Sequence, residues 1–276
     1  MNTLAADEAD LERRFGGLRR LYGDAGYARL RTARIGVVGV GGVGSWAVEA
    51  LARCGVAELL LFDLDHVAES NINRQVQASS GTLGQAKVQA LAERIAGIHP
   101  ACRVHGIEAF VQADNWPGLL PQAVDVLIDA CDQSSAKLTL ARWALDTGAA
   151  LVCVGAAGGK RRADAVTVAD LAEATHDPLL ASLRQRLRKT GAGPQTHQGR
   201  FGLRCVFSRE AVQRPQVPPA DCEVAGPAAA PGSPLACAGY GSTVMVTAAF
   251  GMAAAAEAVA LLLQGAGCQC QNRAIM

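Results

Sequence analysis

A glycine-rich segment has the spacing of a phosphate-binding loop. Gly39, Gly41 and Gly44 fit the pattern G-x-G-x-x-G, and Gly42 lies between them. The residues before the loop, 34–39, are apolar enough for a buried strand, and the residues after it, 45–54, favour a helix. The amides of such a loop and the start of the following helix can face a phosphate. Taken alone, the segment would equally suit a nicotinamide or flavin dinucleotide.

The residues after the next predicted strand, 58–63, favour a different substrate. Asp63 ends that strand about 20 residues after the loop, where an acid commonly holds ribose hydroxyls. The polar segment that follows carries Asp65, Asn71, Arg74, Gln75 and Lys87. A dehydrogenase has no need of that Asn, Arg and Lys. A triphosphate attacked at its α-phosphorus does need them, because charge builds on the phosphoryl oxygens and the leaving pyrophosphate.

Two further acids follow the strand predicted over residues 124–129. Asp129 and Asp132 would lie at the carboxyl edge of the sheet, where a carboxylate can hold a Mg²⁺ ion that keeps most of its waters. We expect Asp132 to be the metal residue, because it lies further out of the sheet, and Asp129 to orient the strand end.

These residues together resemble the ubiquitin-activating-type (ThiF/MoeB-like) adenylating enzymes, which include the activators of the molybdopterin and thiamine sulfur carriers. The resemblance covers roughly residues 14–155. Its motifs, in chain order, are Gly39 to Ser45, Asp63-x-Asp65, Ser70-Asn71-x-x-Arg74-Gln75, Gly84-x-x-Lys87 and Asp129-x-x-Asp132.

The remainder of the chain narrows the resemblance to the bacterial tRNA threonylcarbamoyladenosine dehydratases. The segments that carry this similarity are Arg14-Phe15-Gly16-Gly17, Arg20-Leu21-Tyr22-Gly23, Gly158-Gly159, Asp177-Pro178-Leu179, Cys205-Val206-Phe207-Ser208 and Met245-Val246-Thr247. It implies ATP-dependent cyclisation of threonylcarbamoyladenosine in tRNA through an acyl-adenylate, with release of AMP and pyrophosphate. Two alternatives stay open: adenylation of a sulfur-carrier protein's C-terminal carboxylate, and a non-catalytic nucleotide-sensing module. The carrier activators typically hold zinc with CxxC pairs, which this sequence lacks.

The resemblance also implies a role for each motif residue. The phosphates would lie on Gly39, Gly41, Gly42, Gly44 and Ser45, and the ribose on Asp63. Asn71, Arg74 and Lys87 would grip the triphosphate, with Asp65 and Gln75 beside them, although Asp65 could instead cap the loop. Arg74, Lys87 and Asp132 would be the catalytic residues, Asp132 through Mg²⁺. A bound monovalent cation is a further open expectation.

The elements that position these residues form an α/β fold with a Rossmann-like, mostly parallel sheet and flanking helices. Apolar strand-like segments alternate with helix-prone ones up to residue 155, which implies right-handed crossovers. We divide the chain into a helical arm (1–32), an ATP-binding core (33–155) and a smaller C-terminal extension (156–276). The extension has a strand-like stretch at 161–170, a basic helix at 178–189, a Pro-rich segment at 214–234 and an apolar helix at 243–263.

Composition restricts the partners. The 26 basic and 25 acidic side chains give a formal charge of +1, so an RNA partner must be held by a local patch. Candidates for tRNA contact are Arg184, Arg186, Arg188, Lys189 and Arg200, although a solvated helix face is the ordinary alternative. The resemblance makes a homodimer and a sulfur-transfer protein further candidate partners. Arg14 could reach a partner subunit's ATP site or form a surface ion pair.

The cysteines and the apolar helix are the features of the sequence that indicate where in the cell the protein is located. The 9 cysteines have no paired CxxC spacing, which suggests reduced thiols in the cytoplasm. Cys205 and Cys237 are the candidates for a nucleophile or sulfur carrier, but no neighbouring base marks either as a low-pKa thiol. We expect residues 243–263 to form a buried or dimer-interface helix, with membrane association as the alternative, because they are rich in alanine and contain Glu257.

Overall fold

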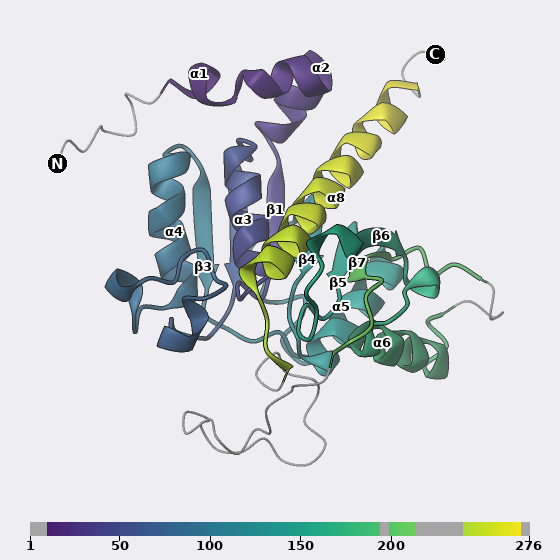
Figure 1. Cartoon of the computed structure of the whole chain (residues 1–276). Helices are drawn as coiled ribbons and strands as arrows, with labels where there is room; N and C mark the ends of the chain where they lie inside the picture. The colour runs from purple at the N-terminus through teal and green to yellow at the C-terminus, as the bar shows by residue number, and fades with distance from the viewer. Residues whose placement is uncertain (1–9, 194–198, 214–239, 272–276) are drawn as a thin grey trace.

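The chain folds around one seven-stranded sheet with the order β3-β2-β1-β4-β5-β7-β6 (Figure 1). The computed structural model describes residues 10–193, 199–213 and 240–271, the last seven of these by their backbone only. All strand pairs are parallel except β6 with β7. The strands are β1 (Arg34–Val38), β2 (Glu58–Phe62), β3 (Arg103–Ile107), β4 (Val126–Asp129), β5 (Leu151–Val154), β6 (Val166–Asp170) and β7 (Arg204–Ser208). The predicted α/β fold with a mostly parallel sheet is confirmed.

Helices cover both faces of this sheet. They are α1 (Leu11–Phe15), α2 (Gly17–Leu30), α3 (Gly44–Arg53), α4 (Lys87–Ile98), α5 (Ser134–Thr147), α6 (Pro178–Lys189) and α8 (Val244–Gln271). Apolar residues of α3, α4 and α8 share one core cluster with one face of the strands, whereas those of α5 and α6 share a second cluster with the other face. Since both faces are covered, the central strands are buried along their whole length, as their unbroken apolar sequences predict.

The C-terminal half contributes strands to the same sheet. β7 pairs with β5 on one side and with β6 on the other, so the sheet continues past residue 155. The predicted strand over 161–170 is shorter than expected, because a 3₁₀ turn over Ala163–Ala165 precedes β6. The sequence patterns do not predict β7. It is held by partners that lie far away in the sequence, and a five-residue segment has no periodicity that distinguishes such a strand.

The helices α1 and α2 lie at the amino ends of the strands, at the top of Figure 1. The Phe15 ring packs on the buried ring of His99 with centroids 4.7 Å apart. Arg14 donates from Nη1 to the carbonyl oxygen of Ile98 at 2.7 Å, so within the described chain it completes the end of α4 and forms no ion pair. Gly23 has φ 72°, and this left-handed residue kinks α2.

α8 crosses the sheet and packs mainly on α3 (Figure 1). Val246, Phe250, Ala254 and Ala258 are fully buried in the core that α8 shares with α3 and the strands. Glu257 forms an ion pair with Arg204 of β7 at 2.6 Å. Over Val244–Gln264 the helix is long and apolar enough to cross a membrane, and half of its most apolar window is buried inside the protein. The helix is therefore part of the core of this fold.

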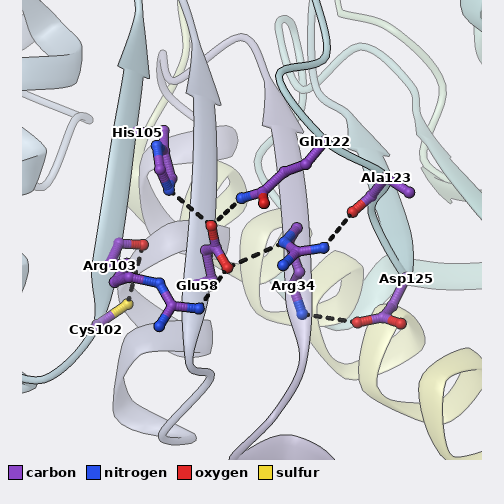
Figure 2. Close-up of polar contacts among 8 residues, drawn as sticks. All are labelled: Arg34, Glu58, Cys102, Arg103, His105, Gln122, Ala123 and Asp125. Atoms are coloured by element: carbon purple, nitrogen blue, oxygen red, sulfur yellow. Dashed lines mark hydrogen bonds and ion pairs between the residues drawn. The ribbon is translucent and has the colours of Figure 1, made fainter.

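A buried carboxylate ties together the first residues of the three strands β1, β2 and β3. Figure 2 shows Glu58 between Arg34 and Arg103, which lie opposite it in the strand register. Its Oε2 accepts from Arg34 Nε at 3.0 Å and Arg103 Nη2 at 2.8 Å. Its Oε1 bonds His105 Nε2 at 2.7 Å and accepts from Gln122. Burial alone would raise the Glu58 pKa, but the hydrogen bonds from Arg103, Arg34 and His105 outweigh it and lower the pKa to about 2.

This cluster predicts a defined acid sensitivity. The folded pKa of Glu58 lies below its ordinary value of 4.5, so its contribution to stability is complete above pH 4.5 and is lost as the pH falls towards 2. Urea unfolding should show Glu58→Gln less stable than the wild type at neutral pH. The difference between the two proteins in free energy of unfolding should become steadily smaller as the pH falls below 4.5. A difference that stays constant down to pH 3 would contradict the assignment, and Asp146→Asn, at an exposed position of α5, serves as the matched control.

Candidate active site

A cavity of about 340 Å³ opens at the carboxyl ends of the central strands. It brings together most of the residues that the sequence predicts for the site. Those that line it are Gly39, Gly41, Gly42, Asp63, Asp65, Asn71, Arg74, Gln75, Lys87 and Asp132. Gly44 and Ser45 do not line it. The carboxyl edge of a parallel sheet is where ligands bind in such folds, so this cavity is the candidate active site.

The glycines fulfil two different structural requirements. Gly39 has φ 80°, and a Cβ there would lie 2.9 Å from the backbone nitrogen of Cys131. At Gly44 a Cβ would lie 1.8 Å from the carbonyl oxygen of Gly39, so this residue permits the tight turn into α3. A Cβ at Gly42 would lie 3.3 Å from Arg74 Cδ, so the glycine there leaves room for the arginine side chain, whereas a Cβ at Gly41 would meet nothing closer than Gln75 Nε2 at 3.9 Å. Ser45 is fully buried and its Oγ accepts from the Val76 amide at 3.4 Å, so it joins α3 to the polar loop rather than reaching the cavity.

Asp63 at the end of β2 is held by backbone amides. Its Oδ2 accepts from the amide of Val40 at 2.8 Å, and its Oδ1 accepts from the amide of Asp65 at 2.9 Å. Burial is the largest influence on this carboxyl and raises its pKa. Each carboxylate oxygen has a second lone pair, so Asp63 can still accept a hydroxyl hydrogen from a molecule in the cavity.

The polar loop after β2 aims Asn71 and Arg74 into the cavity. Asn71 Oδ1 accepts from the amide of Ala68 at 3.1 Å, which fixes the side chain. Arg74 Nη1 donates to the carbonyl of Ser70 at 2.7 Å and to Asn73 Oδ1 at 3.0 Å. The other guanidinium nitrogens of Arg74 form no hydrogen bond with any described residue. The arginine is therefore pre-positioned with donors left for a ligand.

Lys87 at the start of α4 is buried and forms an ion pair with Asp65. The distance from its Nζ to Asp65 Oδ2 is 2.7 Å. Asp65 is the more exposed partner, and its carbonyl also accepts the Lys87 amide at 3.0 Å. The carboxylate of Asp65 thus orients the lysine, a role that neither expectation for this residue included. Gln75 accepts from Gln77 Nε2 at 3.2 Å, and that same nitrogen holds the carbonyl of Val40 in the glycine loop.

The two acids after β4 have different surroundings. Asp129 is fully buried, with Oδ2 2.8 Å from Lys137 Nζ, and Oδ1 accepting from Cys131 Sγ at 2.9 Å. Asp132 is exposed at the cavity and has no hydrogen-bond partner in the described part of the chain. The geometry suits a structural role for Asp129 and leaves the Asp132 carboxylate available. No cluster of three or more His, Cys, Asp or Glu side chains that could hold a metal occurs among the described residues.

Several lining residues are not predicted by the sequence. Phe110, Cys131 and Gln133 form part of the wall, and Leu179 and Thr247 come from the C-terminal half. Thr247 belongs to a segment that resembles the dehydratases, but nothing local marks its side chain as part of a site. Its Oγ lies 3.5 Å from the carbonyl oxygen of Arg74, so the start of α8 supports the polar loop.

The predicted tRNA-contact residues are largely engaged within the protein. Arg184 Nη1 donates to the carbonyls of Leu171 and Ala174, and Arg186 Nη1 donates to the carbonyl of Ser134. The Arg188 guanidinium lies over the Phe201 ring at 5.5 Å. Lys189 and Arg200 are exposed. The number of basic residues in this helix is therefore larger than the number of basic side chains available to contact RNA phosphates.

Of the two candidate thiols, the one that the structure describes, Cys205, does not support nucleophilic chemistry. Cys205 is fully buried in β7, and its contact with Cys153 together with burial raises its pKa well above the ordinary value. Cys237 lies outside the described residues. A thiol with a raised pKa is protonated at neutral pH and is a poor nucleophile.

Comparison with known proteins adds to this geometry. The model of the ThiF family matches residues 14–275. The chain is 38% identical over 263 residues to a tRNA threonylcarbamoyladenosine dehydratase of Haemophilus influenzae, covering 95% of this chain and 98% of the relative. It is 39% identical over 256 residues to the Escherichia coli protein of the same name, covering 93% and 96%. A solved structure of the E. coli tRNA N6-threonylcarbamoyladenosine dehydratase in complex with ATP superposes with a TM-score of 0.83 at 37% identity, covering 95% and 98%.

A more distant relative matches only part of the chain. A molybdopterin-synthase adenylyltransferase of Salmonella typhimurium is 35% identical over 112 residues, 41% of this chain and 45% of the relative. The similarity to the dehydratases, by contrast, extends through the C-terminal half. On the family match and on these full-length similarities, the chain belongs to the ThiF family.

Proposed function

We propose that this protein catalyses the ATP-dependent cyclisation of threonylcarbamoyladenosine in tRNA. The observation that carries the proposal is the single cavity that joins the glycine loop, Asp63, Arg74, Lys87 and Asp132. It is supported by the nearly full-length identity to proteins that bear the dehydratase name and by the related structures solved with ATP and with AMP.

The reaction we propose has two steps. The carboxylate of the modified nucleoside attacks the α-phosphorus of ATP, forming an acyl-phosphate bond while the bond to pyrophosphate breaks. The carbamoyl nitrogen of the same side chain then attacks the activated acyl carbon and loses a proton, and AMP departs with the acyl oxygen. The second step is intramolecular, so it needs positioning more than acid–base chemistry.

The described side chains supply positive charge where the first step requires it. Arg74 can fork two phosphoryl oxygens, and Lys87 acts as a point charge held by Asp65. Asn71 offers its amide nitrogen, and Asp63 a carboxylate for ribose hydroxyls. All of these groups are fixed by hydrogen bonds within the protein, so little reorganisation accompanies the build-up of charge.

Asp132 fits a magnesium site of the kind that accompanies nucleotides. Mg²⁺ on a triphosphate is usually held by one or two carboxylates, phosphate oxygens and water. The exposed carboxylate of Asp132 at the cavity, which pairs with no described residue, would provide such a ligand. When bound there, the ion would neutralise charge on the phosphate oxygens. A homodimer, a sulfur-transfer partner and a monovalent cation stay predictions from the family resemblance, and a cytoplasmic location stays a prediction from the cysteine pattern.

The test is nucleoside analysis after incubation with ATP. We expect tRNA bearing threonylcarbamoyladenosine to yield a nucleoside lighter by one water, with AMP and pyrophosphate formed in equal amounts. Unmodified tRNA should give neither product. If mass spectrometry finds no cyclised nucleoside, the proposal fails. Pyrophosphate exchange driven by a sulfur-carrier protein instead of tRNA would favour the carrier-activating alternative.

A further inference from the structure

A second hollow lies beside the candidate active site, on the other side of the first turn of α6. Its volume is about 610 Å³. We call it the His176 hollow; its lining residues are Ala174, Thr175, His176, Asp177, Pro178, Ala181, Arg184, Ala211 and Val212. Pro178 lines this hollow, while its neighbour Leu179 lines the active-site cavity. Consecutive Cα atoms are about 3.8 Å apart, so the two cavities are immediate neighbours.

Hydrogen bonds join the walls of the two cavities. Asp177 Oδ2 accepts from the amide of Ala156, which lines the active-site cavity, and Asp177 Oδ1 caps α6 through the amide of Leu180. His176 has φ 55°, and its carbonyl accepts from the buried ammonium of Lys160 at 2.8 Å. Lys160 also donates to the carbonyl of Glu210. These hydrogen bonds fix the walls of the His176 hollow relative to the walls of the active-site cavity.

Three arginines in or near the hollow have no carboxylate partner in the described chain, although the carboxylates of Asp177, which lines the hollow, and of Glu210 lie in the same region and accept from backbone amides. Arg184 lines it and donates from Nη1 only to backbone carbonyls. Arg161 and Arg209 are exposed and lie close to the hollow in the chain: Arg161 follows Lys160, whose ammonium reaches the carbonyl of the lining residue His176, and Arg209 lies two residues before the lining residue Ala211. No carboxylate in the described chain forms an ion pair with any of these three arginines. Arg162, in contrast, is paired with Asp164 at 2.6 Å.

We propose that the His176 hollow binds an unstacked base of the tRNA next to the modified nucleotide, while Arg161 and Arg209 hold the flanking phosphates. This inference rests on the proposed function. Alanine, proline and valine side chains offer an apolar floor for the face of a base, and His176, Thr175 and Arg184 offer polar atoms to its edge. Proteins commonly recognise single-stranded RNA by splaying bases out, packing them against aromatic side chains or arginine guanidinium planes, and hydrogen-bonding their edges. Unpaired arginines suit phosphates, and on a chain of formal charge +1 an RNA site must concentrate its charge locally.

The test uses two variants: one fills the His176 hollow with a side chain, and the other removes the two arginines proposed to hold phosphates. Ala181 is exposed on α6, so Ala181→Phe should place a ring in the hollow while sparing the core. Binding of an anticodon stem–loop RNA that bears threonylcarbamoyladenosine is measured by fluorescence anisotropy at several salt concentrations. Because the phenyl ring would occupy the space proposed for the base, we expect RNA binding to weaken by about tenfold, which corresponds to about 1.4 kcal/mol. Arg161→Ala/Arg209→Ala should also weaken binding and reduce the magnitude of the logarithmic salt dependence by about 1.4, since each single-strand phosphate contact contributes about 0.7.

Controls separate this inference from the proposed function. Gln89→Phe on α4 introduces a ring and Arg142→Ala on α5 removes an arginine at exposed positions elsewhere, and both should leave RNA binding unchanged. ATP affinity should be the same in all variants. RNA affinity and salt dependence that match the wild type in both test variants would overturn the inference, while cyclisation by the wild type would still support the function. Weakened RNA binding accompanied by equally weakened ATP binding would also overturn it, since the hollow would then merely support the active site.

Discussion

Arg74→Ala should slow the formation of AMP and pyrophosphate by about 10³-fold while the protein remains folded. The arginine lines the cavity, and its Nη1 is already fixed to the carbonyl of Ser70. Trp46 Nε1 and Thr247 Oγ donate to the backbone carbonyl of Arg74, which alanine retains. The substitution therefore leaves these structural hydrogen bonds in place. Removing one pre-positioned donor for developing charge usually costs about 10²–10³ in rate, and a phosphate-clamping arginine more. We therefore expect a loss of about 10³-fold in kcat/KM for ATP.

The comparison with Arg74→Lys tests the reason for the loss. Lysine keeps the charge but cannot fork two oxygens, so this variant should retain intermediate activity. Arg142→Ala, an exposed position on α5, should behave as the wild type. Rates come from AMP release with modified tRNA, and circular dichroism reports the fold. Activity of Arg74→Ala within about tenfold of the wild type would refute the role, because that corresponds to only about 1.4 kcal/mol.

Lys137→Met should lower the stability of the folded protein severely. Lys137 and Asp129 are both fully buried and 2.8 Å apart. Burial would lower the pKa of Lys137, but Asp129 outweighs it and raises the pKa, so the lysine is charged in the folded protein. Removing one partner of a buried pair leaves the other charge uncompensated, which costs about 3–5 kcal/mol. Urea unfolding measures this as a shift in the midpoint.

Replacing both Lys137 and Asp129 shows whether the loss of stability comes from an unpaired buried charge or from the changed packing. Lys137→Met/Asp129→Leu removes the stranded charge but leaves the amide and thiol of Cys131 without their acceptor, at a cost of about 1–3 kcal/mol for a buried unpaired group. The double variant should be more stable than Lys137→Met alone. If the single variant lost less than about 1 kcal/mol, the ion pair would not be a major support of the site.

Local sequence patterns predict the first half of the fold closely. The strands predicted at 34–39, 58–63 and 124–129 and the helix predicted at 45–54 differ from the observed elements by one or two residues, and in the second half the helix at 178–189 has the predicted bounds. The strands are apolar along their length because both faces are buried, and the helices are apolar at helical spacing. The helix α6 begins as the sequence indicates, with Asp177 as its N-cap and Pro178 as its first residue. The motif residues of the site converge on one cavity because parallel strands bring their carboxyl ends to one edge.

The features that the sequence does not predict depend on contacts between distant segments. β7 is defined by its two neighbouring strands, and Thr247 enters the cavity wall only because α8 packs across α3. The charge pattern of α6 predicts exposed arginines, whereas the donors of Arg184 and Arg186 meet backbone carbonyls supplied by other segments. Lys137, an ordinary helical residue by sequence, meets Asp129 only after the turn between β4 and α5 has formed.

The packing of α8 against the first half of the fold has a consequence for synthesis on the ribosome. Thr247 and the carbonyl of Arg74 that it supports are separated by 173 residues. At translation rates of about 5–20 residues per second, the polar loop waits roughly 10–30 s for that contact. Meanwhile the apolar face that α3 and the strands later share with α8 stays uncovered. The nascent chain is therefore a candidate client for chaperones that hold exposed apolar surface until the last helix emerges.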